Sequence, residues 1–201
     1  MASYADDDLA PTKTEGFKLG EKKTVKEYTE LDENDESLRR WKQSLGIGSG
    51  KDLSDPSDPR KAIILSLGLE AEGRPDIIID LTAPGAVEAL KKKPFAIKEG
   101  AAFRMKATFK VQHEVLSGLK YIQVVKHHHT KVRVSKDEEM IGSFSPNTND
   151  KPSHESKFAW SNAPSGIVAR TKYDVVSKFT DDDDNTHLLF EWSFEIKKSW
   201  E

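Results

Sequence analysis

Two short runs of this sequence carry side chains that could bind a metal ion. In the first, His127-His128-His129, neighbouring residues of a strand would point to opposite faces, so three in a row cannot converge on one ion. The second, Asp181 to Asp184, offers four carboxylates but lacks the spaced Asp-x-Asp-x-Asp-Gly pattern of a calcium loop. A solvated strand end and a solvated hairpin tip are the simpler interpretations. For the acidic run, a third interpretation is a landing site for a basic peptide.

Catalytic motifs are missing from the sequence. It contains no nucleophile elbow, P-loop, dinucleotide fingerprint or His-Glu-x-x-His pattern. It has no cysteine, which excludes disulfides and Cys-based zinc sites. We therefore expect no catalytic residues, no metal and no cofactor. The net charge of −3 also argues against a general nucleic-acid binder.

The acidic run lies between two stretches with the period-2 alternation that strands with one buried face show. The later stretch runs from His187 to Trp200 and the earlier one from Ile167 to Phe179. Large apolar residues fill one row of the later stretch, namely Leu188, Phe190, Trp192, Phe194 and Ile196. Two such runs joined by a polar loop predict a hairpin, whose aromatic row belongs to a core or to the wall of an apolar cavity.

Similar patterns extend back to about residue 61. The longest alternation runs from Phe103 to Val115, and turn signals such as Ser117-Gly118 and Ser145-Pro146-Asn147 separate the runs. Seven to nine short strands with regular turns predict an all-β fold, an immunoglobulin-like antiparallel β-sandwich over residues 61–201.

Residues 1–60 form a polar arm with two short helical patterns. Thr24 and Glu27 have capping-box spacing and predict a helix near 24–32, and a second pattern predicts a helix near 35–45. Isolated helices of this length are marginal in water, so their apolar stripes need a partner surface. Either they fold onto the chain's own domain, or they become ordered on binding another protein. We expect a flexible regulatory arm.

The stretch from Gly46 to Arg60 has the Gly, Ser, Asp and Pro content of a linker. Hydrophobic residues make up only 36% of the chain, which indicates that part of it is unfolded when alone. The first residues lack the apolar core of a secretory signal, and the sequence has no long apolar run and no lipidation motif. We expect a cytoplasmic protein.

Several longer motifs follow one another in a fixed order. They are residues 31–42 (LDENDESLRRWK), 98–100 (KEG), 117–123 (SGLKYIQ), 179–183 (FTDDD), 191–192 (EW) and 196–200 (IKKSW). With these motifs the chain resembles the Rho GDP-dissociation inhibitors, from about Phe17 to Glu201. The resemblance implies a flexible N-terminal arm followed by an immunoglobulin-like sandwich.

What the resemblance implies about function is specific. The arm would inhibit nucleotide exchange and hydrolysis on Rho, Rac and Cdc-type GTPases, bound in their GDP form. The sandwich would hold the geranylgeranyl tail of the GTPase between its sheets and so extract the GTPase from membranes. The protein would be a monomer alone and a heterodimer with the GTPase, without nucleic acid and without stable membrane insertion.

The resemblance also implies site residues. The arm would contact the GTPase through Phe17, Tyr28, Asp35, Ser37, Leu38 and Trp41. An acidic strip would meet its basic tail through Asp181, Asp182 and Asp183. The wall of the prenyl pocket would consist of Leu67, Phe95, Phe103, Val115, Phe190 and Trp192. The chain departs from the family pattern at Phe190, where animal relatives carry Trp, and at Ser135, where an acidic residue is expected in a loop and Asp137 or Glu138 would have to substitute.

Two other functions fit the same patterns. A general prenyl-binding chaperone would use a similar sandwich but would not need the helical arm. A β-sandwich adaptor would have a solid core, and its arm would bind some other protein. Uptake of a prenylated peptide by the sandwich separates the lipid-binding functions from the adaptor.

Overall fold

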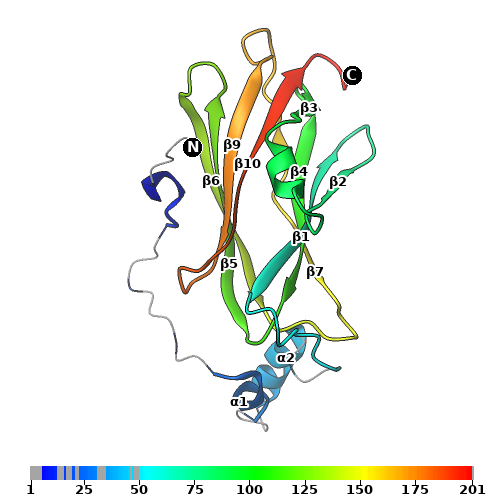
Figure 1. Ribbon diagram of the computed structural model, residues 1–201, viewed down its shortest axis with the longest axis vertical. Coiled ribbons are helices and arrows are strands. Elements are labelled where there is room, and N and C mark those ends of the chain that lie inside the picture. Colours follow the sequence, from blue (N-terminus) through cyan, green and yellow to red (C-terminus); the bar gives the residue numbers. More distant parts are fainter. Residues whose placement is uncertain are drawn as a thin grey trace.

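The computed structural model describes residues 6–12, 16, 20, 23–30, 35–45, 47 and 50–200. Two five-stranded sheets pack face to face as a β-sandwich (Figure 1). The first sheet has the order β2-β1-β4-β7, with β8 paired to β4, and its strands are β1 (Ala62–Ala71), β2 (Ile77–Asp80), β4 (Ala102–Val111), β7 (His154–Lys157) and β8 (Ser161–Asn162). The second has the order β3-β10-β9-β5-β6, with β3 (Phe95–Lys98), β5 (Leu116–His127), β6 (Arg133–Phe144), β9 (Lys172–Thr180) and β10 (Thr186–Lys197).

Strand pairing follows the predicted antiparallel pattern with one exception. The short strand β3 runs parallel to the end of β10, with Phe95 beside Phe194. The side chains between the sheets form one continuous apolar core. The all-β, immunoglobulin-like fold predicted from the turn signals and alternation is therefore confirmed.

The predicted C-terminal hairpin is present as β9 and β10. On β10, Phe190, Trp192 and Ile196 are buried, as the alternation predicted. The predicted start of the preceding run, at Ile167, is too early. Ile167 and Val168 are 83% and 92% exposed and lie before the first residue of β9. The chain there forms a loop that is held by Glu99, whose carboxylate accepts hydrogen bonds from the Gly166 amide and the Arg170 guanidinium.

The long alternation of β4 is confirmed only as far as Val111. Up to that point every second residue is buried, from Met105 onward. The backbone then leaves the sheet, and His113 adopts a left-handed conformation with φ 71°. As a consequence Val115 lies in the turn between β4 and β5 and does not continue the inward row.

The arm contains a 3-10 helix, η1 (Asp6–Leu9), and two α-helices, α1 (Val25–Glu30) and α2 (Glu36–Leu45). The capping box predicted for the first α-helix is confirmed. The Thr24 amide donates to Glu27 Oε2 over 2.6 Å, and the Glu27 amide donates to Thr24 Oγ1 over 3.2 Å. Both α-helices lie beyond the end of the sandwich where the turn between β4 and β5 is found (Figure 1).

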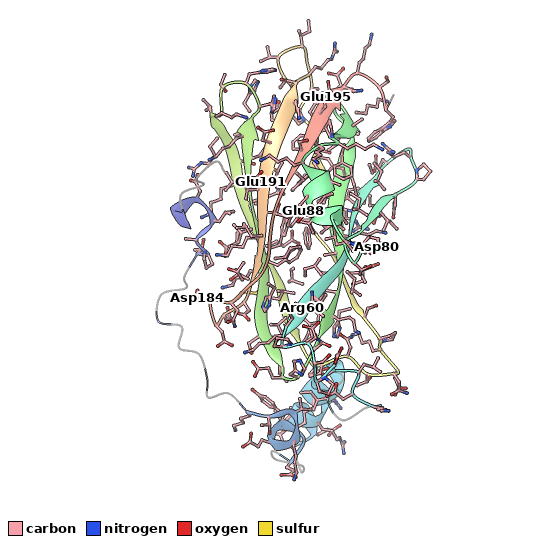
Figure 2. The ribbon with its side chains drawn as sticks, in the orientation of Figure 1. Arg60, Asp80, Glu88, Asp184, Glu191 and Glu195 are labelled. Atoms are coloured by element: carbon pink, nitrogen blue, oxygen red, sulfur yellow. The ribbon has the colours of Figure 1, made fainter. Side chains whose placement is uncertain are left out.

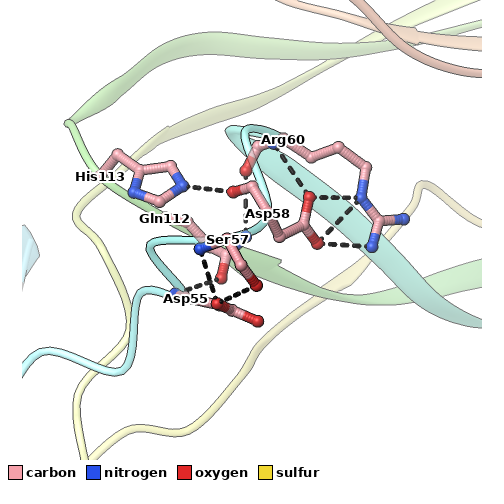
Figure 3. A network of polar contacts seen from close by, with 6 residues as sticks. All are labelled: Asp55, Ser57, Asp58, Arg60, Gln112 and His113. Atoms are coloured by element: carbon pink, nitrogen blue, oxygen red, sulfur yellow. Dashed lines mark hydrogen bonds and ion pairs between the residues drawn. The ribbon is translucent and has the colours of Figure 1, made fainter.

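The segment whose composition indicated a linker is bound to that end of the sandwich (Figure 3). The Asp55 amide donates to Gln112 Oε1, and Gln112 Nε2 donates to the Arg60 carbonyl, each over 3.0 Å. His113 Nε2 lies 2.7 Å from the Asp58 carbonyl oxygen. Hydrogen bonds from the Arg60 side chain and backbone lower the pKa of Asp58 to about 2. These contacts fix the point from which the arm departs.

Candidate functional site

An apolar slot opens between the two sheets beside α3 (Ala86–Leu90). Strands β1, β2, β4, β3 and β10 and the end of α3 line it with Leu67, Gly68, Leu69, Ile77, Ile79, Leu90, Phe95, Met105, Phe190 and Trp192. The space measures about 300 Å³ with its open mouth included, but its enclosed part has room for about one water molecule. The slot is therefore apolar and nearly closed.

One wall of the slot is held rigidly by buried hydrogen bonds. The Trp192 indole N–H donates to Ser177 Oγ over 2.9 Å, and Ser177 Oγ lies 2.7 Å from the Tyr121 hydroxyl. Burial raises the pKa of Tyr121, so the hydroxyl keeps its proton. Phe95 packs edge-on against Trp192, with 5.8 Å between ring centroids. A shift of the indole would break a buried hydrogen bond, which fixes the position of this wall.

Helix α3, which packs against β10, is held more weakly. Helix α3 has five residues, far fewer than an isolated helix needs, and it begins at Gly85 without a side-chain cap. Leu90 is its one buried residue, at 5% exposure, and points into the slot. An ion pair between Lys91 and Glu191 connects the end of α3 to β10, and Figure 2 shows Glu191 on that strand. The Ser193 hydroxyl also donates to the Lys91 carbonyl over 3.5 Å, and since so exposed an ion pair contributes little, Leu90 is the main apolar anchor of α3.

Four of the six residues predicted for the prenyl pocket line this slot, namely Leu67, Phe95, Phe190 and Trp192. Phe103 packs at the margin of the core and Val115 lies in the β4–β5 turn, so the structure places neither in the slot. The structure adds lining residues that were not predicted, among them Ile77, Ile79 and Leu90. The apolar run at 77–79 was visible in the sequence, but its pairing with β1 was not.

The acidic run forms the tip of the β9–β10 hairpin. Asp181 is 2% exposed, and its carboxylate accepts hydrogen bonds from His187 Nε2, the Asn185 amide and side chain, and the Asp183 amide. Burial alone would raise the pKa of Asp181, but the hydrogen bonds from His187 and Asn185 outweigh it and lower the pKa. Asp182 pairs with Lys120 over 3.0 Å, with both side chains 14% exposed.

Asp181 is therefore not an exposed member of the predicted strip but the internal acceptor of the hairpin tip, and the contact of the strip with a GTPase stays a prediction. Asp182 is largely neutralised by Lys120, and its amide donates to the Ser117 carbonyl. Gly118, with φ 59°, lies so close to the Asp182 carboxylate that a Cβ there would collide with it. Asp182 and Asp183 are half-buried, and Asp184 next to them is exposed.

In the arm, Asp35 caps α2. Its Oδ1 accepts hydrogen bonds from the Ser37 amide (2.8 Å) and the Leu38 amide (3.1 Å). Ser37 is exposed, whereas Tyr28 and Leu38 are half-buried. Phe17 and the side chain of Trp41 lie outside the described residues. The capping role of Asp35 is thus observed, and its contact with a GTPase stays a prediction.

Ser135 and His128, two further polar residues singled out in the sequence, have structural partners. Ser135 lies within β6 and not in a loop, and its hydroxyl donates to Asp137 over 3.0 Å. His128 Nδ1 lies 2.7 Å from an Asp174 carboxylate oxygen at the end of β5. Within the described ranges, no three His, Asp or Glu side chains converge as a metal site would require. None of the helices described in this chain has the length and apolar character needed to cross a bilayer.

Comparison with known proteins connects this slot and arm to one family. A family model described as "RHO protein GDP dissociation inhibitor" matches residues 2–199. The chain belongs to the Rho GDP-dissociation inhibitor family. It is 42% identical to the Rho GDP-dissociation inhibitor of Saccharomyces cerevisiae over 184 residues, which cover 90% of each chain.

Two further members of the Rho GDP-dissociation inhibitor family extend this comparison. The protein from Schizosaccharomyces pombe is 41% identical over 182 residues, covering 90% of this chain and 86% of the relative. Rho GDP-dissociation inhibitor 1 of Rattus norvegicus is 37% identical over 202 residues, covering all of this chain and 94% of the relative. The match therefore includes both the helical arm and the sandwich, and the resemblance found in the motifs is confirmed.

Proposed function

We propose that this protein binds prenylated Rho-family GTPases in their GDP form, slows GDP release and holds the geranylgeranyl group in the slot between its sheets. The observation that carries the proposal is an apolar slot next to Trp192 in a chain whose whole length matches this family. The protein acts by binding and not by catalysis. It forms a one-to-one complex with the GTPase in the cytoplasm, without nucleic acid.

The slot must open before a lipid can enter, since its enclosed part holds about one water molecule. Because Ser177 holds the Trp192 indole in place, we assign the opening to α3 and β2. Outward movement of Leu90 lengthens the apolar space toward Ile77 and Ile79 without breaking the hydrogen bonds between β9 and β10. In this proposal α3 moves to admit the lipid, while Trp192 and the strands β9 and β10 stay in place.

Lipid binding alone does not extract a GTPase from a membrane. A geranylgeranyl chain has twenty carbons, and burying them is worth on the order of 16 kcal/mol at about 0.8 kcal/mol per carbon. The bilayer offers a similar gain, so the slot roughly balances it. The net extraction comes from protein contacts, which the arm supplies because it is covalently held beside the docked GTPase. Asp35 and Ser37, at the start of α2, are the proposed contact residues for the switch loops.

The experiment that tests this function combines two readouts. Vesicles carrying a geranylgeranylated, GDP-loaded Rho-type GTPase are mixed with the protein, and GTPase in the supernatant and release of labelled GDP are measured. Extraction together with slowed release supports the proposal. Extraction of the GTPase with no effect on GDP release indicates a general prenyl chaperone, and failure of both readouts overturns the proposed function.

A further inference from the structure

The outer face of the second sheet carries an apolar patch that the sandwich core does not use. Ile122 and Val124 of β5 and Val176 of β9 point away from the core, with Val124 directly opposite Val176 in the strand register. All three are at most 2% exposed. Because the sheet has no second layer there, something else must cover them.

The cover is the first described segment of the chain, Asp6–Thr12 (Figure 1). Leu9, at the end of η1, is 5% exposed and forms one apolar cluster with those three residues. Burial of a leucine side chain favours the docked segment over the undocked one by about 10- to 100-fold. A segment that lies more than one hundred residues away in sequence thus has a specific apolar anchor on the sheet.

Polar contacts on both sides of Leu9 fix the direction of the segment. Asp8 pairs with Lys126 of β5 (3.2 Å) and Arg133 of β6 (3.3 Å), which are cross-strand neighbours. Without Asp8, two cations would stand opposite each other on one sheet, which is unfavourable. The Lys126 hydrogen bond also lowers the pKa of Asp8.

The contacts continue after Leu9. Lys136 Nζ donates to the Ala10 carbonyl over 2.9 Å, and the Thr12 amide donates to Glu138 Oε2, also over 2.9 Å. Both partners lie on β6. The sheet therefore offers the segment a set of apolar side chains, a pair of cations and hydrogen bonds to its backbone. These are the elements of a peptide-docking site.

We propose that the outer face of β5, β6 and β9 is a docking site for an acidic segment with a leucine anchor, and that its occupant is this chain's own Asp6–Thr12. The contact fixes the start of the arm to the sandwich, while residues 52–60 fix its end. The helices α1 and α2 then belong to a loop closed at both ends. Closure restricts the conformations of the loop and holds both helices near the sandwich.

The test uses full-length variants and a fluorescent peptide with the sequence of residues 4–12. Leu9→Asp removes the anchor and empties the site, whereas Ala10→Asp adds the same charge at a neighbouring exposed position and leaves Leu9 in place. Leu9→Asp should bind the peptide at least tenfold more tightly than either the wild type or Ala10→Asp, because in those proteins the attached segment competes. Binding should weaken with salt, since Asp8 contributes through Lys126 and Arg133.

A peptide carrying Leu9→Asp should not bind any of the three proteins. Equal peptide binding by wild type and Leu9→Asp, or no binding above that of the substituted peptide, overturns the docking site. The effect of docking on how the arm inhibits a GTPase rests on the proposed function and is measured in a separate assay. With a Rho-type GTPase, Leu9→Asp should weaken the inhibition of GDP release several-fold while Ala10→Asp does not. If the peptide binds but inhibition is unchanged, the docking site stands and its role in presenting the arm is refuted.

Discussion

Replacing Leu90 by Ala is expected to destabilise the empty protein and at the same time to tighten its binding of a geranylgeranylated peptide. Leu90 is the buried residue of α3 and occupies the slot in the lipid-free structure. The substitution removes three carbons from α3. The empty protein loses their contacts, whereas the lipid-bound protein gains room for the ligand in their place.

The magnitudes follow from this exchange. Leu→Ala in a core costs about 2–5 kcal/mol, and the lower end applies here because α3 is short and can settle toward the sheet. The three lost carbons are worth about 2.4 kcal/mol of transfer free energy at ~0.8 kcal/mol each. If the lipid recovers most of that contact, its affinity rises by up to about 30-fold, which corresponds to ~2 kcal/mol.

Urea unfolding of the empty protein gives the first quantity, and titration with a fluorescent geranylgeranylated peptide gives the second. The control is Leu116→Ala, a buried leucine of the same core that does not line the slot. It should lower the free energy of unfolding by a similar amount without tightening peptide binding. An affinity that is unchanged or reduced in Leu90→Ala refutes the placement of the lipid beside α3.

Three further outcomes follow from the buried polar groups. Ser177→Ala leaves the Trp192 indole N–H without its acceptor. It should lower the free energy of unfolding by about 1–3 kcal/mol and weaken the near-ultraviolet circular dichroism signal of the indole, which depends on a fixed ring position. Asp181→Ala removes the side-chain acceptor of the hairpin tip and should raise amide exchange at Asp183 and Asn185 at neutral pH; unchanged exchange would contradict the role given to this carboxylate. Burial lowers the pKa of His154 from 6.5, so below pH 6.5 the unfolded chain binds the proton more readily than the folded protein. Stability should therefore fall as the pH drops from 7 to 5, and His154→Phe should show a flatter pH profile in urea unfolding.

Local sequence patterns were sufficient to predict some of the site residues. Phe190 and Trp192 alternate with polar residues, and the period-2 rule alone places them on the buried face of β10. Asp35 precedes an apolar stripe and caps α2 for the same local reason that sequence analysis uses to find helix starts. Rows of this kind depend on neighbours within a few residues, so the sequence determined the strands of the hairpin, both arm helices and the all-β class.

Tertiary structure alone decided which rows face each other and which charges find partners. Asp181 and Asp183 belong to the same run of four aspartates, yet it is Asp181 that is buried, because the strand register brings His187 to it. The slot exists because β2 and α3 leave a gap against the fixed Trp192, and a gap between elements has no signature in either one. Leu9 could not be assigned to the outer sheet face for the same reason. Its partners are more than one hundred residues away, and only chain folding brings them into contact.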